Sequence, residues 1–181
     1  MLVCGSAYSL FPDLYKAAVV FPGVPRIAVK GASGFIKSSI LFGLHPGKLD
    51  GMREAQLKFH SDFTVHTAGD IEDFNRFGKA KTGSYDCHWG DLGGGCSGWS
   101  GVKMALKMGF DQVVMCGIPL EKGGYSDGMF SKHFQTQKII DRYRGHVLKD
   151  SEIHPQVISM SGWTREILGD HFILDGKTSS M

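Results

Sequence analysis

The sequence has no long apolar segment, no low-complexity stretch and no excess of either charge. No apolar run approaches the roughly 20 residues that a bilayer-spanning helix needs. The 20 Lys and Arg residues nearly balance the 18 Asp and Glu residues, giving a net charge of +2. Nucleic-acid-binding domains instead carry a clustered positive excess. We therefore expect neither a membrane nor a nucleic acid as partner, and the composition leaves the oligomeric state open.

Cysteine is also scarce. The four cysteines are Cys4, Cys87, Cys96 and Cys116, and no two of them form a CxxC pair. We expect reduced thiols and no metal site, because disulfide frameworks and zinc sites usually show paired spacings. A zinc site built from Cys87, His88 and Cys96 stays open as an alternative, although its spacing fits no standard ligand pattern. No acidic DxD motif is present.

The amino terminus, MLVCGSA, lacks the basic segment that opens a secretory signal peptide. Together with the reduced thiols, this favours a cytoplasmic protein. The chain also lacks long internal repeats and interdomain linkers. We expect a single domain over residues 1–175, followed by a loose C-terminal tail over 176–181.

Glycine is abundant, with 25 residues, and five of them are clustered in the segment 93–101, GGGCSGWSG. We expect a loop there, then a helix over 102–108 and a buried strand over 113–116. Glycines let a backbone come close to a ligand, and the first N–H groups of a helix have no partner within it. These groups and the helix dipole favour a phosphate, and Ser97 and Ser100 add hydroxyls. The alternative is a flexible loop that leads into an ordinary surface helix.

Short apolar runs alternate with amphipathic segments along the whole chain. Strands are expected over 2–4, 26–30, 38–44, 63–67, 87–89, 113–116 and 157–160. One helix is expected to start near Pro12. Four more are expected over 48–59, 102–108, 130–147 and 163–168, and Ser161 is expected to cap the last of them. This alternation predicts the α/β class, with a Rossmann-like three-layer domain and a mainly parallel sheet.

In such sheets ligands bind outside the carboxyl ends of the strands, where the strand order reverses. Turns of small residues follow several of the expected strands, so we expect these turns to meet at one edge. The residues expected to contact a nucleotide there are Gly5, Ser6 and Ser9; those expected around its phosphate are Ser97, Gly98, Ser100 and Gly101; and those expected along its base are Gly117, Ile118 and Pro119. Lys30 could pair with a phosphate, but a charged residue at the end of a strand is more often simply solvated.

The segment SGWSGVKMALKMGFDQVVMCGIPL resembles the bacterial sialyltransferases that use CMP-sialic acid, and the related Rossmann-like group of hydroxymethylpterin diphosphokinase-like proteins. The matching residues are Ser100-Gly101, Met108-Gly109-Phe110 and Gly117-Ile118, together with an amino-terminal turn over 5–10. The chain departs from these families at Pro119, where an Asp is usual, and in lacking an Asn in the first turn. It is also shorter than the transferases. The chain also resembles short proteins carried by phages and prophages.

The resemblance implies a CMP-type nucleotide or nucleotide-sugar ligand, bound without metal, and a Tyr125 that assists the leaving phosphate. Glycosyl transfer also needs a base, and histidine is suited to that role near neutral pH. His133 and His154 are the leading candidates, with His45 third, although a surface role is an alternative for each.

The sequence thus predicts a nucleotide or nucleotide-sugar binding protein, with a metal-independent, glycosyltransferase-like activity as its enzymatic form. The alternative is a non-catalytic nucleotide-binding protein or a phage accessory or assembly factor. A phage-encoded chain would act in the cytoplasm of its bacterial host.

Overall fold

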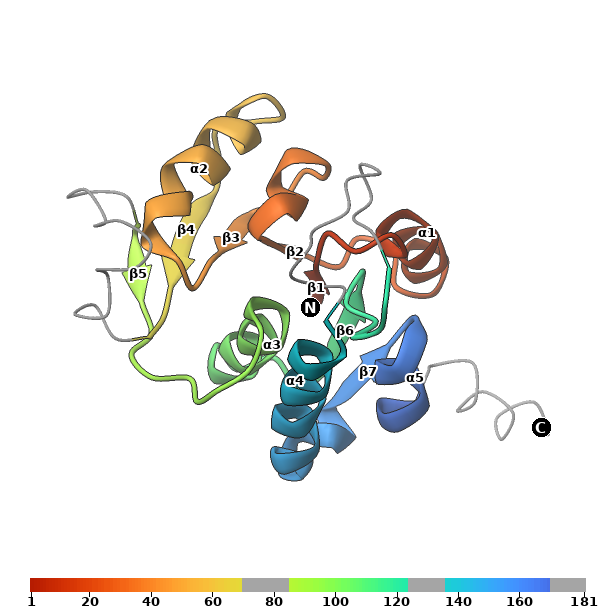
Figure 1. Cartoon of the computed structure of the whole chain (residues 1–181). Coiled ribbons are helices and arrows are strands. Elements are labelled where there is room, and N and C mark those ends of the chain that lie inside the picture. Colours follow the sequence, from red (N-terminus) through yellow and green to blue (C-terminus); the bar gives the residue numbers. More distant parts are fainter. Residues whose placement is uncertain (70–84, 124–135, 170–181) are drawn as a thin grey trace.

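The fold is built on a seven-stranded sheet in which every observed strand pair is parallel (Figure 1). The computed structural model describes residues 1–69, 85–123 and 136–169. The strands are β1 (Leu2–Cys4), β2 (Arg26–Val29), β3 (Ile40–Phe42), β4 (Thr64–Thr67), β5 (Cys87–His88), β6 (Val113–Cys116) and β7 (Val157–Ser159). The predicted α/β class, with a Rossmann-like three-layer arrangement, is confirmed.

The strand order is β5-β4-β3-β2-β1-β6-β7. The chain adds strands outward from β1 to β5, then returns to place β6 on the other side of β1. The order therefore reverses between β1 and β6. In doubly wound sheets a crevice opens outside the carboxyl ends of the strands at such a point.

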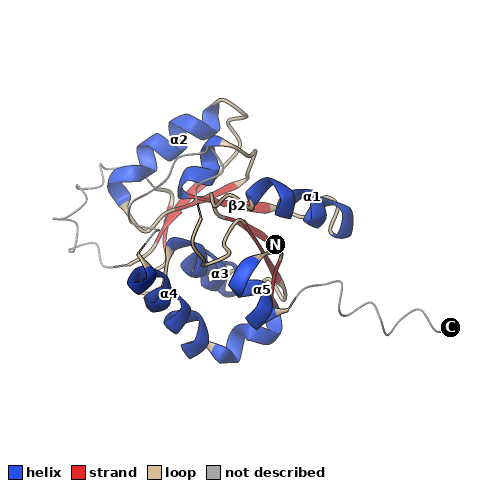
Figure 2. Cartoon of the chain, turned by 45° about the vertical axis from the view of Figure 1, so that its right-hand side comes forward, coloured by secondary structure: helices blue, strands red, loops and turns tan. Residues whose placement is uncertain are grey.

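Helices lie on both faces of the sheet (Figure 2). They are α1 (Leu10–Val20), α2 (Leu49–Leu57), α3 (Ser97–Lys107), α4 (Gln137–Lys149) and α5 (Gly162–Leu168), with short 3₁₀ turns η1 (Lys30–Gly34), η2 (Pro46–Lys48) and η5 (Ser151–Gln156). The apolar residues of α1 and α2 share one core cluster, and those of α3 and α4 share another. Val3 belongs to the second cluster and its neighbours Leu2 and Cys4 to the first, as the alternation of side chains along a strand requires.

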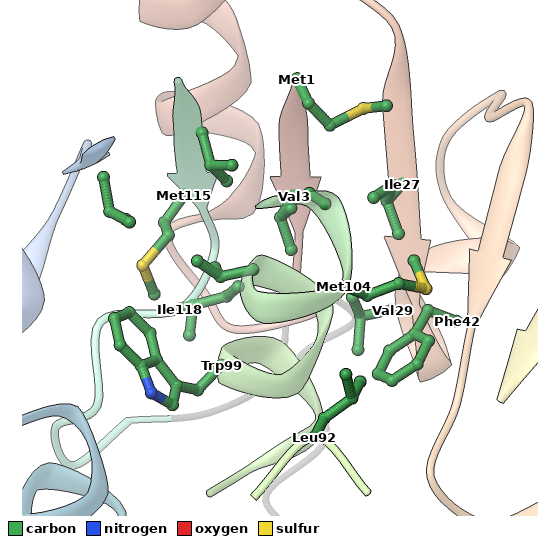
Figure 3. Close-up of a cluster of buried hydrophobic side chains, with 14 of the residues drawn as sticks. Met1, Val3, Ile27, Val29, Phe42, Leu92, Trp99, Met104, Met115 and Ile118 are labelled. Carbon is green, nitrogen blue, oxygen red and sulfur yellow. The ribbon is translucent and has the colours of Figure 1, made fainter. Parts of the chain in front are cut away.

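Helix α3 packs closely on the centre of the sheet (Figure 3). A β-carbon at Gly101 would lie only 3.2 Å from side-chain atoms of both Val3 and Val29. The glycine therefore sets the short distance between this helix and the sheet. Trp99, on the same helix, is fully buried, and its indole N–H donates to Asp150 Oδ2 at 2.7 Å.

Several element boundaries differ from the sequence-based expectation. Helix α3 begins at Ser97, so the expected loop over 93–101 was wrong beyond residue 96. Its glycines at 98 and 101 are helical and serve packing. Ser161 makes no side-chain capping bond to α5, because its hydroxyl bonds elsewhere. The early part of the helix expected over 130–147, and the tail over 176–181, lie outside the described residues.

Two negative findings concern the described part of the chain. No helix in it is long and apolar enough to cross a membrane. It also contains no group of three metal-ligating side chains, so Cys87, His88 and Cys96 do not form the zinc site that the sequence left open.

Candidate anion site at the switch point

The turns after β1 and β6 touch each other. The Gly5 N–H donates to the Cys116 carbonyl at 2.8 Å, and the Ala7 N–H donates to the Gly117 carbonyl at 3.2 Å. A β-carbon at Gly5 would lie 2.5 Å from the Gly117 carbonyl oxygen, and Gly117 has a left-handed φ of 66°. Close backbone contact at the switch point therefore accounts for both glycines without any ligand.

Three further expected residues are also engaged by the fold. The Ile118 side chain is buried and lies against Gly98, where a β-carbon would approach it to 2.9 Å. The Thr164 hydroxyl donates to the Ile118 carbonyl at 2.8 Å, and the Thr164 N–H donates to the Pro119 carbonyl at 3.4 Å. The segment expected to line a base pocket is thus covered by α5 in this structure.

Ser9 belongs to a buried polar network. The Ser161 hydroxyl donates to Asp13 Oδ2 at 2.6 Å, and its oxygen lies 2.8 Å from the Ser9 hydroxyl. The same Asp13 oxygen accepts the Gly117 N–H at 2.8 Å. Asp13 is only 1 % exposed. These bonds explain why Ser161 does not cap α5, and they join α1, β6 and α5 at the edge where the site was expected.

Two hydroxyls at the start of α3 are buried without a partner. Ser97 is the first residue of the helix and Ser100 lies one turn further on. They are 5 % and 0 % exposed, and within the described part of the chain neither hydroxyl has a hydrogen-bond partner. Buried hydroxyls are usually satisfied, because leaving one unpaired costs about 1–3 kcal/mol. The residue before the helix, Cys96, makes no side-chain capping bond either.

Positively charged groups lie next to this helix end. The Lys30 ammonium, at the carboxyl end of β2, is close enough to Cys96 for the two groups to influence each other's pKa. Burial lowers the pKa of Lys30. Burial also lowers the pKa of His45 to about 4, and the charges of Lys30 and Lys48 act in the same direction. Among the residues that the structure describes, no carboxylate acts on either pKa, and the charges that these residues place here are positive.

Cys96 is the residue directly before α3. Burial raises the pKa of its thiol, while the N–H groups of Trp99 and Gly98 and the charge of Lys30 act in the opposite direction. The first N–H groups of α3 therefore point toward the sulfur, which is a weak hydrogen-bond acceptor. Cys96 makes no capping hydrogen bond by distance and angle, so a phosphate oxygen placed here would be a stronger acceptor for these N–H groups than the thiol is.

The backbone at this edge is strained. Within the described residues, Lys30 (φ 51°) and Leu120 (φ 50°) are the two non-glycine residues with a left-handed backbone. Lys30 directly follows β2, and Leu120 comes shortly after β6. Beside Lys30, a β-carbon at Gly31 would come within 3.1 Å of the Ser6 hydroxyl oxygen. The turns after β1 and β2 are thus neighbours, as the sequence predicted.

The candidate bases are placed less favourably. His154 lies in η5, where its Nε2 donates to the Val147 carbonyl at 2.8 Å and its ring meets the edge of Trp99. That nitrogen carries a proton and is already engaged. His45 lies at the positive edge described above. Tyr125 and His133 are outside the described residues.

The structure thus brings Ser6, Gly98, Ser97 and Ser100 to the edge where the strand order reverses. Gly5 and Gly117 are in contact at the same edge.

Sequence reasoning favoured a solvated role for Lys30. Its left-handed backbone and its burial next to α3 could not be read from the residue type, although its position directly before a Gly-Ala-Ser-Gly turn was visible. Comparisons with protein-family models, curated proteins and solved structures gave no match.

Proposed function

We propose that this protein binds the phosphate of a nucleotide or nucleotide sugar at the start of α3. The observation that carries the proposal is the pair of buried, unpartnered hydroxyls of Ser97 and Ser100 at the switch point of a doubly wound sheet. A ligand oxygen at this position would satisfy groups that the protein leaves unpaired.

The geometry of a helix supports this reading. Residues three apart lie on the same face of a helix, so the two hydroxyls are neighbours. The first N–H groups of α3 and its dipole favour a negative charge at the same end. The positive field from Lys30 and Lys48 acts in the same sense. A phosphate matches this set of donors better than a neutral ligand does.

The cytidine class of ligand rests on the resemblance to CMP-sialic acid-dependent transferases, and a transferase reaction would be its enzymatic form. Two observations favour the second candidate, a binding protein without catalysis. The Nε2 of His154 is engaged by a backbone carbonyl, and Pro119 stands where the transferases carry an Asp. A phage accessory protein that only binds a nucleotide would need neither group.

A thermal-shift panel of CMP, CDP, UMP, UDP, AMP and GMP tests the proposal. A ligand at 100 times its Kd adds about 2.7 kcal/mol to the free energy of unfolding, which raises Tm by several degrees in a chain of this size. The Ser97→Ala and Ser100→Ala variants should bind roughly 10-fold or more weakly, since each lost bond to a charged group is worth about 1.5–3 kcal/mol.

The same variants should not be less stable when free, because the deleted hydroxyls have no partner to lose. Ser151→Ala, at an exposed serine of η5, is the matched control and should bind like the wild type. Binding that survives in both helix variants would place the ligand elsewhere. Turnover of a CMP-sugar, assayed across a panel of acceptors, would then separate an enzyme from a binding protein.

A further inference from the structure

We infer that Lys30 is the cationic residue of this site and that it selects a ligand whose phosphate or diphosphate carries two negative charges. This inference rests on the proposed function, since it names the charge of the group bound at α3. It adds a residue of β2 to a site otherwise formed by α3. Three observations carry it.

The first observation is the backbone of Lys30. A left-handed conformation costs a residue other than glycine roughly 1–2 kcal/mol. Such residues persist where the surrounding structure holds them, and they gather at functional sites. Lys30 adopts φ 51° at the carboxyl end of β2, directly before Gly31. A glycine at position 30 would avoid the cost, so the lysine side chain is present for a reason other than the turn.

The second observation is the missing counter-charge. Lys30 is half-buried, and within the described residues its ammonium has no hydrogen-bond or ion-pair partner. The ion pairs of this part of the chain join Arg53 to Asp86 and Lys103 to Asp150 instead. Buried charges are normally paired. An anionic ligand would supply the partner that the described residues do not.

The third observation is the position of the ammonium. It acts electrostatically on Cys96, the residue that precedes Ser97. It also acts on His45, on which Lys48 acts with the same sign. The geometry of the neighbouring residues agrees: Val29, directly before Lys30, lies 3.2 Å from where a β-carbon at Gly101 of α3 would be. Two positive side chains and a positive helix end favour a doubly charged group over a singly charged one, since no acid of the described segments acts on these groups.

The test compares wild type with Lys30→Met, which keeps the length of the side chain and removes its charge. Lys37→Met, at an exposed lysine of the following segment, is the matched control. The probes for calorimetry are CMP, cytidine 2′,3′-cyclic phosphate with one charge, cytidine with none, and inorganic pyrophosphate. Wild type and Lys37→Met should bind CMP and pyrophosphate roughly 10-fold or more tightly than Lys30→Met does, and should prefer CMP to the cyclic phosphate.

A Lys30→Gly variant gives a readout that needs no ligand. Relief of the strain should raise the Tm of the free protein by about 2–4 °C, together with the same loss of binding. A variant that is more stable but no longer binds would show that the strained backbone at Lys30 serves ligand binding. An unchanged or lower Tm would contradict the account of the strained backbone.

The outcomes separate the two proposals. If CMP binds equally well to wild type and Lys30→Met, the inference is wrong and the nucleotide site stands. If pyrophosphate binds in a Lys30-dependent manner and no nucleotide binds, the inference stands and the nucleotide proposal is wrong. Binding of none of the probes by wild type would overturn both.

Discussion

At the scale of single residues, the described glycines differ in whether a β-carbon would fit. Gly5 and Gly117 lie in backbone contact between the central strands, whereas Gly51 faces open space on α2. The residue type alone could not distinguish these cases. The residue type favoured ligand binding as the role of Gly5. The structure shows instead that a β-carbon at this position would collide with the Gly117 carbonyl oxygen, a backbone atom that cannot move aside as a side chain could.

Gly5→Ala should therefore lower the free energy of unfolding by about 1–3 kcal/mol or more, as overpacking of a tight core does. Gly51→Ala is the control: with no atom within 4 Å of the added methyl group, it should raise stability by about 0.5–1 kcal/mol. Urea unfolding of both variants checks this. Equal effects of the two substitutions would show that the contact between Gly5 and Gly117 does not constrain the fold.

His45 should make the folded protein sensitive to mild acid. Its pKa falls from 6.5 to about 4 on folding, first through burial and then through Lys30 and Lys48. Between these two pH values, His45 is protonated in the unfolded chain and neutral in the folded chain. The contribution of neutral His45 to the free energy of unfolding is fully present above the unfolded pKa, and it is lost as the pH falls from 6.5 toward 4.

His45→Gln should remove part of this loss. The measurement is the urea midpoint at about pH 7 and about pH 5, where wild type should lose more stability than the variant. The same fall in both proteins would mean that His45 does not contribute. Because an anion at the site would raise the pKa of His45, a bound phosphate should also reduce the acid sensitivity of wild type.

At the scale of elements, α3 shows where reasoning from sequence works and where it fails. The helix expected over 102–108 was correct at its C-terminal end, since α3 ends at Lys107. The start was misplaced by five residues, because Gly98 and Gly101 suggested a loop. In the structure those glycines allow the helix to lie close to the sheet. Glycine disfavours a helix locally, and tertiary packing overrode that preference here.

Asp13 joins three elements that are distant in the sequence. It accepts bonds from Gly117 after β6 and from Ser161 before α5, and it lies on α1. As an acid in the first turn of α1, Asp13 also lies at the positive end of that helix. Its partners, 104 and 148 residues away, depend on a strand order that local patterns do not encode.

Asp13→Ala should thus destabilise the fold by about 1–3 kcal/mol for each donor that loses its partner. Asp13→Asn keeps an acceptor oxygen and should cost less, and Asp62→Ala, at an exposed aspartate, should be nearly neutral. Guanidinium unfolding gives the three values. A loss in Asp13→Ala no larger than that in Asp62→Ala would show that the network is not needed for stability.

At the scale of the whole molecule, the alternation of strands and helices predicted the α/β class, and the rule for doubly wound sheets predicted that the glycine turns meet at one edge. The order of the strands fixes which turns meet there. Gly5 proved to be next to Gly117, and Val29, directly before Lys30, proved to pack against Gly101 of α3. The strain at Lys30 and the unpaired hydroxyls of Ser97 and Ser100 emerge only when the chain is folded.

The central claim is that an anion binds where the strand order reverses, at the start of α3. Two-dimensional ¹H–¹⁵N NMR of the free protein during a titration with CMP tests it most directly, because it reports each backbone amide separately. We expect the largest shifts at Ser97, Gly98, Trp99 and Gly31, with little change at amides of α2 such as Gly51. Shifts concentrated away from these residues, or none at saturating CMP, would contradict the claim.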